Sequence, residues 1–272
     1  MAISSFGLMG MLARKTGKMR AMSTDFPWPL RSSVALLLVI LLAACASPPT
    51  PLKSAVSPTA PLASSLDAEF QSLQTEHGGL LQAVDAAGSN VRILVFRGGK
   101  APQLGHNHVL TVPRLKGWLW APPQGLAGAR FGLEFRLDEL LMDAPEQRAR
   151  LGSGWASVLS PEYVAATREH MLGADNLQAD AFPWVRLRSL QITGEAPELA
   201  AEVEIELHGQ RQRHWVALHA QPSPKSASAW QVNGSLVVRQ SDFGVKPYSL
   251  LGGLLAVRDE LVIDFSVQTQ PR

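Results

Sequence analysis

Residues 201–207 read Ala-Glu-Val-Glu-Ile-Glu-Leu, and this stretch decides the fold class. Its apolar residues fall at every second position, with a glutamate between each pair. Because successive side chains of a β-strand point to opposite faces, the stretch predicts a strand with one dry face and one solvated face. A helix would need an apolar period near 3.6 residues, which this stretch lacks.

The same alternation recurs in three further stretches. Their apolar residues are Phe131, Leu133, Phe135 and Leu137; Trp230, Val232, Leu236 and Val238; and Leu261, Ile263, Phe265 and Val267. Further strands are predicted at 81–84, 90–96, 115–120, 184–190 and 214–219. A closed barrel removes the sheet edges and collects the apolar faces inside. We therefore predict that residues 80–272 form an all-β domain, an antiparallel closed barrel of about eight strands.

Two short helices are predicted beside the strands. Ser160-Pro161 places an N-cap residue before a proline at the first helical position, and helical spacing continues to Gly173. The residues that show this spacing are Tyr163, Ala166, His170 and Met171. We expect this helix to pack over one end of the barrel. A second, short amphipathic helix is expected within 66–79.

The N-terminal region predicts export and lipidation. Arg31 precedes the apolar run 34–42, which is shorter than the roughly 20 residues that a membrane span needs. The run ends in Leu42-Ala43-Ala44-Cys45, which resembles a bacterial lipoprotein box with Cys45 as the lipidated mature N-terminus. We therefore predict a lipoprotein signal peptide at 1–44 and a lipid anchor on Cys45. Ala46, where an inner-membrane signal would have Asp, favours the periplasmic face of the outer membrane over the inner membrane.

Residues 45–65 predict a tether between the lipid and the domain. Five prolines stand among Ser, Ala and Thr in this segment. Such a composition cannot bury a core and favours extended, solvated backbone.

Composition and motifs exclude several classes of function. Hydrophobic residues make up 46% of the 272 residues, which is enough for a sizeable core. Beyond residue 44 the chain has 20 basic and 22 acidic residues, so no basic excess favours nucleic acid. The one cysteine permits no intramolecular disulfide and no thiolate metal cluster. Because the sequence has no Gly-x-Ser-x-Gly elbow, phosphate-binding Gly-Lys loop or His-Glu-x-x-His motif, we expect a protein that is not an enzyme.

Gly105-His106-Asn107-His108 is the one cluster that suggests metal chemistry. On a strand His106 and His108 would project to the same side, and two imidazoles at that spacing can share a metal ion. A third ligand would have to come from a distant histidine, namely His170, His208, His214 or His219. The alternative function is therefore a metal- or partner-binding accessory module that presents His106 and His108 on a solid barrel.

The order of the segments along the barrel resembles that of the YceI family. The resemblance covers 80–268 and rests on Ser89-Asn90-Val91, Gly105-His106-Asn107-His108 before Gly117, Arg168–Leu172, Phe182–Val185, Val203–Leu207 with His208-Gly209, and Ser241-Asp242-Phe243-Gly244. It implies an exported, lipocalin-like protein that binds a long isoprenoid chain in an elongated barrel.

The resemblance and the dry strand faces together predict non-enzymatic binding or transport of an amphipathic isoprenoid or other long-chain lipid in the lumen. The residues expected to contact the ligand are Phe131, Leu133, Phe135, Val203, Ile205, Leu207, Trp230, Val232, Leu261, Ile263 and Phe265. No metal and no cofactor other than the bound lipid is expected, and the partners are this lipid and the membrane that holds Cys45. A filled barrel, in which the apolar faces form only a core, is left open, as is the oligomeric state. Gly234 on the dry face would either leave space or mark a bend.

Overall fold

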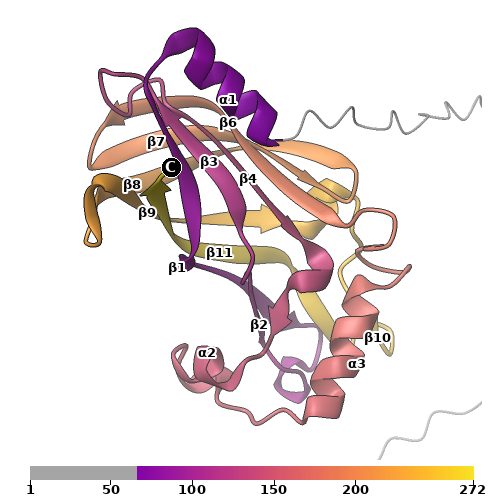
Figure 1. Ribbon diagram of the computed structural model, residues 1–272. Coiled ribbons are helices and arrows are strands. Elements are labelled where there is room, and N and C mark those ends of the chain that lie inside the picture. The colour runs from indigo at the N-terminus through magenta and orange to yellow at the C-terminus, as the bar shows by residue number, and fades with distance from the viewer. Residues whose placement is uncertain (1–65) are drawn as a thin grey trace, which may run out of the picture. The chain divides into compact units, whose positions relative to one another are not determined.

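The computed structural model describes residues 66–272, which form a closed antiparallel barrel (Figure 1). Eight strands make the ring in the order β1-β3-β4-β6-β7-β8-β9-β11, and β11 pairs back with β1. They are β1 (Leu80–Gly98), β3 (Lys116–Ala121), β4 (Arg130–Arg136), β6 (Trp184–Glu195), β7 (Glu198–Leu207), β8 (Gln210–Ser223), β9 (Ser226–Arg239) and β11 (Leu255–Pro271). The predicted fold class is confirmed. The signal peptide at 1–44, Cys45 and the tether at 45–65 lie outside the described residues.

The alternation of apolar residues places one face of each ring strand inside the barrel. In β7, Leu199, Ala201, Val203 and Ile205 are buried, whereas the glutamates between them lie on the outer face. The four apolar core clusters are all built within 66–272, so this range contains its own core.

Strand β1 joins two stretches that the sequence predicts as separate strands, 81–84 and 90–96. A register shift against β11 lies between Asp85 and Asn90, where the amide of Gly88 donates to Asp85 Oδ1 at 3.0 Å. Such a bulge bends a strand without ending it. As a result β1 pairs with β3 near its start and with β2 (His108–Thr111) near its end.

The longest connections gather at one end of the barrel, at the bottom of Figure 1. Helix α3 (Pro161–Leu172) lies there, and its Ser160 cap accepts a hydrogen bond from the amide of Tyr163 at 3.2 Å. Met171 and Leu172 pack against the core, as expected for a helix over one barrel end. The remaining elements are β5 (Leu141–Met142), β10 (Ser249–Leu250), α2 (Pro145–Ala149) and the 3₁₀ helices η1 (Pro102–Leu104), η2 (Leu137–Glu139), η3 (Ser153–Trp155) and η4 (Gln240–Phe243).

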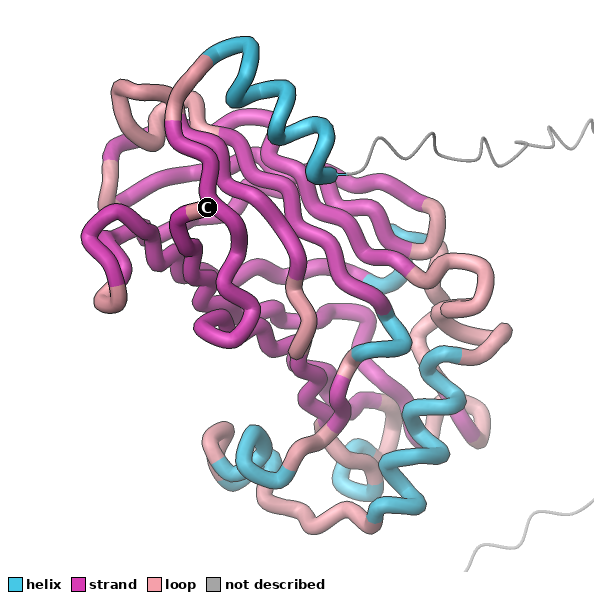
Figure 2. Tube along the Cα trace, viewed as in Figure 1, coloured by secondary structure: helices cyan, strands magenta, loops and turns pink. Residues whose placement is uncertain are grey.

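Helix α1 (Leu66–His77) packs on the outer face of the barrel, against β3 and β1 (Figure 2). It lies within the stretch 66–79, where the sequence predicts a short helix. Leu66 and Phe70 form a small buried cluster with side chains of the wall. Gly132 makes this contact close, because a Cβ there would lie 2.5 Å from Leu66 Cδ1 and 2.7 Å from Phe70 Cε2. None of the helices within 66–272 combines the length and the apolar character needed to span a membrane.

Substituting Gly132→Ala is expected to push α1 off the wall and to lower the free energy of unfolding by about 1–3 kcal/mol, as overpacking commonly does. Urea denaturation and proteolysis within 66–77 measure the effect. Gly105→Ala is the control, since a Cβ at Gly105 would meet no atom closer than 3.6 Å. Equal stability and equal protease resistance of the two variants would show that α1 does not depend on this contact.

Candidate functional site

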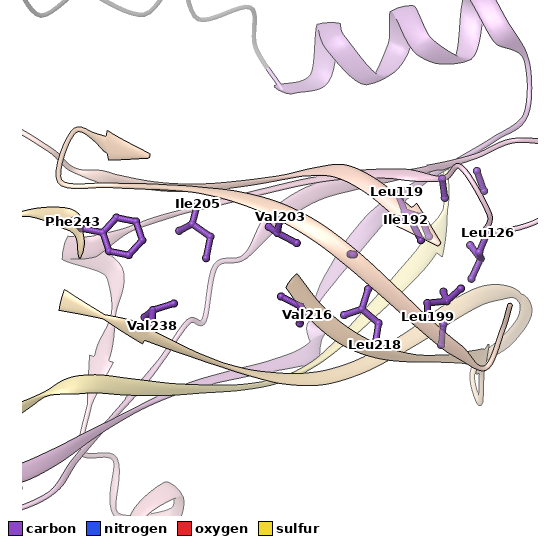
Figure 3. Close-up of a cluster of buried hydrophobic side chains, with 14 of the residues drawn as sticks. Leu119, Leu126, Ile192, Leu199, Val203, Ile205, Val216, Leu218, Val238 and Phe243 are labelled. Carbon is purple, nitrogen blue, oxygen red and sulfur yellow. The ribbon is translucent and has the colours of Figure 1, made fainter. Parts of the chain in front are cut away.

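The inner faces of the barrel strands enclose an apolar cavity of about 150 Å³. All eight ring strands contribute to its wall, and Thr269 supplies the one hydroxyl among the lining residues. Figure 3 shows part of this interior, with Val203 and Ile205 on β7 and Val216 and Leu218 on the neighbouring strand β8. The lumen is therefore open in part rather than wholly filled by side chains.

Eight of the eleven predicted ligand contacts line the cavity. They are Phe131, Leu133, Phe135, Val203, Ile205, Val232, Ile263 and Phe265. The other three, Leu207, Trp230 and Leu261, are half-buried and pack against the core clusters, outside the cavity lining. Leu207 ends β7, Leu261 pairs with Val238 just before η4, and Trp230 lies opposite Pro222 near the β8–β9 turn.

The cavity also has lining residues that the prediction did not name. Most occupy alternate positions of strands that the sequence does predict, so the same period of two could have found them. Examples are Ile93 on β1, Leu119 on β3, Leu187 on β6, Leu199 on β7 and Leu218 on β8. Leu126 and Ala129 lie in the β3–β4 connection, where no period marks them.

The space that the missing side chain of Gly234 leaves is occupied by a neighbouring residue of the barrel wall and does not enlarge the cavity. It pairs with Phe265 across β9 and β11, and a Cβ at 234 would lie 2.4 Å from Phe265 Cζ. The ring of Phe265 therefore occupies the volume that a larger residue at 234 would need.

His108 belongs to a buried ion network at the edge of the barrel. Its Nδ1 lies 2.6 Å from Asp143 Oδ2. Asp143 Oδ1 accepts hydrogen bonds from the amide of Val109 at 3.0 Å and from Arg148 at 2.6 Å. Burial acts to raise the pKa of Asp143, but the bonds from His108, Val109 and Arg148 outweigh it and lower that pKa below its ordinary value. The carboxylate is thus held in its charged form.

His106 has its own partners. Its Nδ1 lies 3.2 Å from Ser157 Oγ, which also accepts a hydrogen bond from Arg148 at 2.9 Å. Burial, and after it the nearby positive groups of His108, Arg148 and Arg97, lowers the pKa of His106. Its imidazole therefore stays neutral to a lower pH than a free histidine.

The described residues bring no third ligand to His106 and His108. Within 66–272 no group of three His, Cys, Asp or Glu side chains is arranged to hold a metal ion. The four distant histidines have other neighbours: Tyr248 for His170, Phe243 for both His208 and His214, and Glu198 for His219.

A family model and several solved structures match parts of the chain. Residues 151–269 match the YceI-like domain family. The structure of BcnA from Burkholderia cenocepacia is 15% identical with a TM-score of 0.50, over 69% of this chain and 99% of that one, and shows the same fold. A polyisoprenoid binding domain from Saccharophagus degradans is 13% identical with a TM-score of 0.47, over 70% of this chain and 98% of that one. A YceI protein of Campylobacter jejuni is 7% identical with a TM-score of 0.45, over 60% of this chain and 85% of that one. No curated protein sequence matches the chain.

Proposed function

We propose that the barrel binds one slender chain of an amphipathic lipid, an isoprenoid or a long acyl chain. The match of residues 151–269 to the YceI-like domain family, which agrees with the resemblance read from the sequence, supports this proposal. The observation that carries the proposal is the apolar cavity within the ring. Removing each methylene from water yields roughly 0.8 kcal/mol, so a long chain can bind there without any catalytic group.

The volume of the cavity decides how many chains it takes. An apolar cavity of about 150 Å³ stays dry and admits a molecule as slender as benzene. The present cavity has the same volume and an almost wholly apolar wall. A cavity that admits one molecule of this size has room for a stretch of one aliphatic chain, but not for two chains side by side.

Native mass spectrometry tests the proposal on residues 46–272, which hold the whole described domain. The protein is exported behind a foreign signal peptide and purified without detergent. We expect one equivalent of a single-chain lipid that is released on denaturation and identified by its mass. A protein that carries no lipid and takes up none from added isoprenoid alcohols would refute a binding function.

We also propose that the protein acts at the periplasmic face of the outer membrane, held there by a lipid on Cys45; the box at 42–45 and the proline-rich tether support this placement. Cys45→Ser is expected to abolish palmitate labelling and to move the protein out of the membrane fraction. Ser47→Ala, two residues along the tether, is the control and should label as the native protein does. Continued labelling of Cys45→Ser in the membrane fraction would contradict the anchor.

A further inference from the structure

One polar side chain reaches the inner face of the barrel beside the cavity. On β8 the inward positions alternate, and His214 stands two residues before Val216, which lines the cavity. Its cross-strand partner on β7 is Val203, another lining residue. Because paired residues share a face of the sheet, the imidazole of His214 points into the barrel at the margin of the cavity.

The Nε2 atom of this imidazole lies buried without a hydrogen-bond partner among the described residues. The ring is stacked near Phe243, with 6.4 Å between ring centroids. His208, on the other side of Phe243, bonds the carbonyl of Phe243 through Nδ1 at 3.1 Å, and its Nε2 is likewise buried and unpartnered. A buried polar atom without a partner costs free energy, so two such atoms beside Phe243 call for an explanation.

Beside His214 the barrel wall contains a helix, η4, next to a part of β8 that is not paired with β9. The β8–β9 ladder runs from Leu218–Gly234 to Ser223–Ser226, so residues 210–217 lie outside it. Helix η4 lies against this part of β8, where Gln212 Nε2 donates to the carbonyl of Asp242 at 2.6 Å. Phe243, with 0% exposure, lies beyond Ile205 at this end of the interior (Figure 3).

We propose that this end, formed by His208, His214 and Phe243, receives the polar head of the lipid, and that His214 Nε2 hydrogen-bonds to an oxygen of that head. This inference rests on the proposed function and adds the position and chemistry of the head group. A charged head would need a compensating charge, and no charged residue is among those that line the cavity. A neutral hydroxyl can both donate and accept, so it satisfies either tautomer of the imidazole.

The test compares phytanol with phytane, which differ only by the hydroxyl, on residues 46–272. Binding is followed by native mass spectrometry at increasing ligand concentration. We expect the native protein to bind phytanol about tenfold more tightly than phytane, the equivalent of one good hydrogen bond. His214→Phe should bring the affinities for phytanol and phytane within about twofold of each other.

Two further variants separate a lost head-group contact from a damaged fold. His219→Phe alters the outward histidine of the same strand, whose side chain is 45% exposed, and should keep the preference for phytanol. His214→Gln places an amide, which can also hydrogen-bond to a hydroxyl, at the site, and it should keep part of the preference for phytanol over phytane. Equal binding of phytanol and phytane by the native protein, or an unchanged preference in His214→Phe, would overturn the inference and assign the unpartnered atoms to buried water. Failure of both ligands to bind would instead refute the proposed function.

Discussion

The Asp143→Asn protein is expected to unfold with a free energy about 3–5 kcal/mol below that of the native chain, the usual effect of removing one partner from a buried ion pair. The Asp143 side chain is fully buried, and that of Arg148 is 6% exposed. Neutralising the carboxylate leaves Arg148 buried without its counter-charge and replaces one of the two acceptor oxygens with an NH2 group. The backbone of Asp143 also ties the segment after β5 to β2, because its amide donates to the carbonyl of Val109 at 2.8 Å.

Urea denaturation at neutral pH measures this effect, with Asp138→Asn as the control. Asp138 pairs with Arg136 at 2.9 Å, but the two side chains are 48% and 37% exposed. An exposed pair contributes at most about 1 kcal/mol, so the control should lose little stability. Similar losses in both variants would show that the buried network contributes no more than an ordinary surface pair.

The same carboxylate makes stability depend on pH. Its folded pKa lies below the ordinary value of 3.8, so the unfolded chain binds the proton more tightly. The stability that this difference provides is complete above the ordinary pKa and is lost as the pH falls through the folded pKa. The native protein should therefore lose stability more steeply than Asp143→Asn as the pH falls below about 4. Parallel pH profiles of the two proteins would contradict the assignment.

The sequence predicts the barrel because its main signal is local. Alternation in 201–207 follows from the two-residue period of a strand, and the wall strands of the cavity repeat it. The same signal assigns a residue to a face but not to a depth, which is why Leu207, Trp230 and Leu261 belong to the inner wall without lining the cavity. Local turn residues at 85–89 likewise cannot tell a bulge in one strand from a boundary between two.

The contacts that the sequence does not predict are those between distant segments. The motif at 105–108 suggests that His106 and His108 act together on a metal ion. In the structure the hydrogen-bond partner of His108 is instead Asp143, 35 residues further along the chain. The meeting of His208 and His214 with Phe243 depends on how η4 closes the gap beside β8. No period or spacing in the chain encodes either contact, because each joins segments that only the tertiary structure brings together.

Replacing Ile205 with Trp is expected to eliminate lipid binding while the barrel remains folded. Ile205 is 5% exposed, lines the cavity and points into the interior next to Phe243 (Figure 3). An indole at this position adds bulk to a cavity of only about 150 Å³ and adds no charge. Overpacking of this kind commonly costs about 1–3 kcal/mol, a loss that most folded domains survive.

Native mass spectrometry of residues 46–272 counts the equivalents of lipid that Ile205→Trp retains, and thermal unfolding verifies that the variant is folded. Val237→Trp is the matched control, since Val237 is 56% exposed and therefore lies on the outer face of β9. The control should keep one full equivalent, whereas we expect Ile205→Trp to retain less than a tenth of it, about the loss that 1.4 kcal/mol of binding free energy gives. A folded Ile205→Trp protein that still carries a full equivalent would place the chain elsewhere in the barrel, because an indole and an aliphatic chain cannot share the same space.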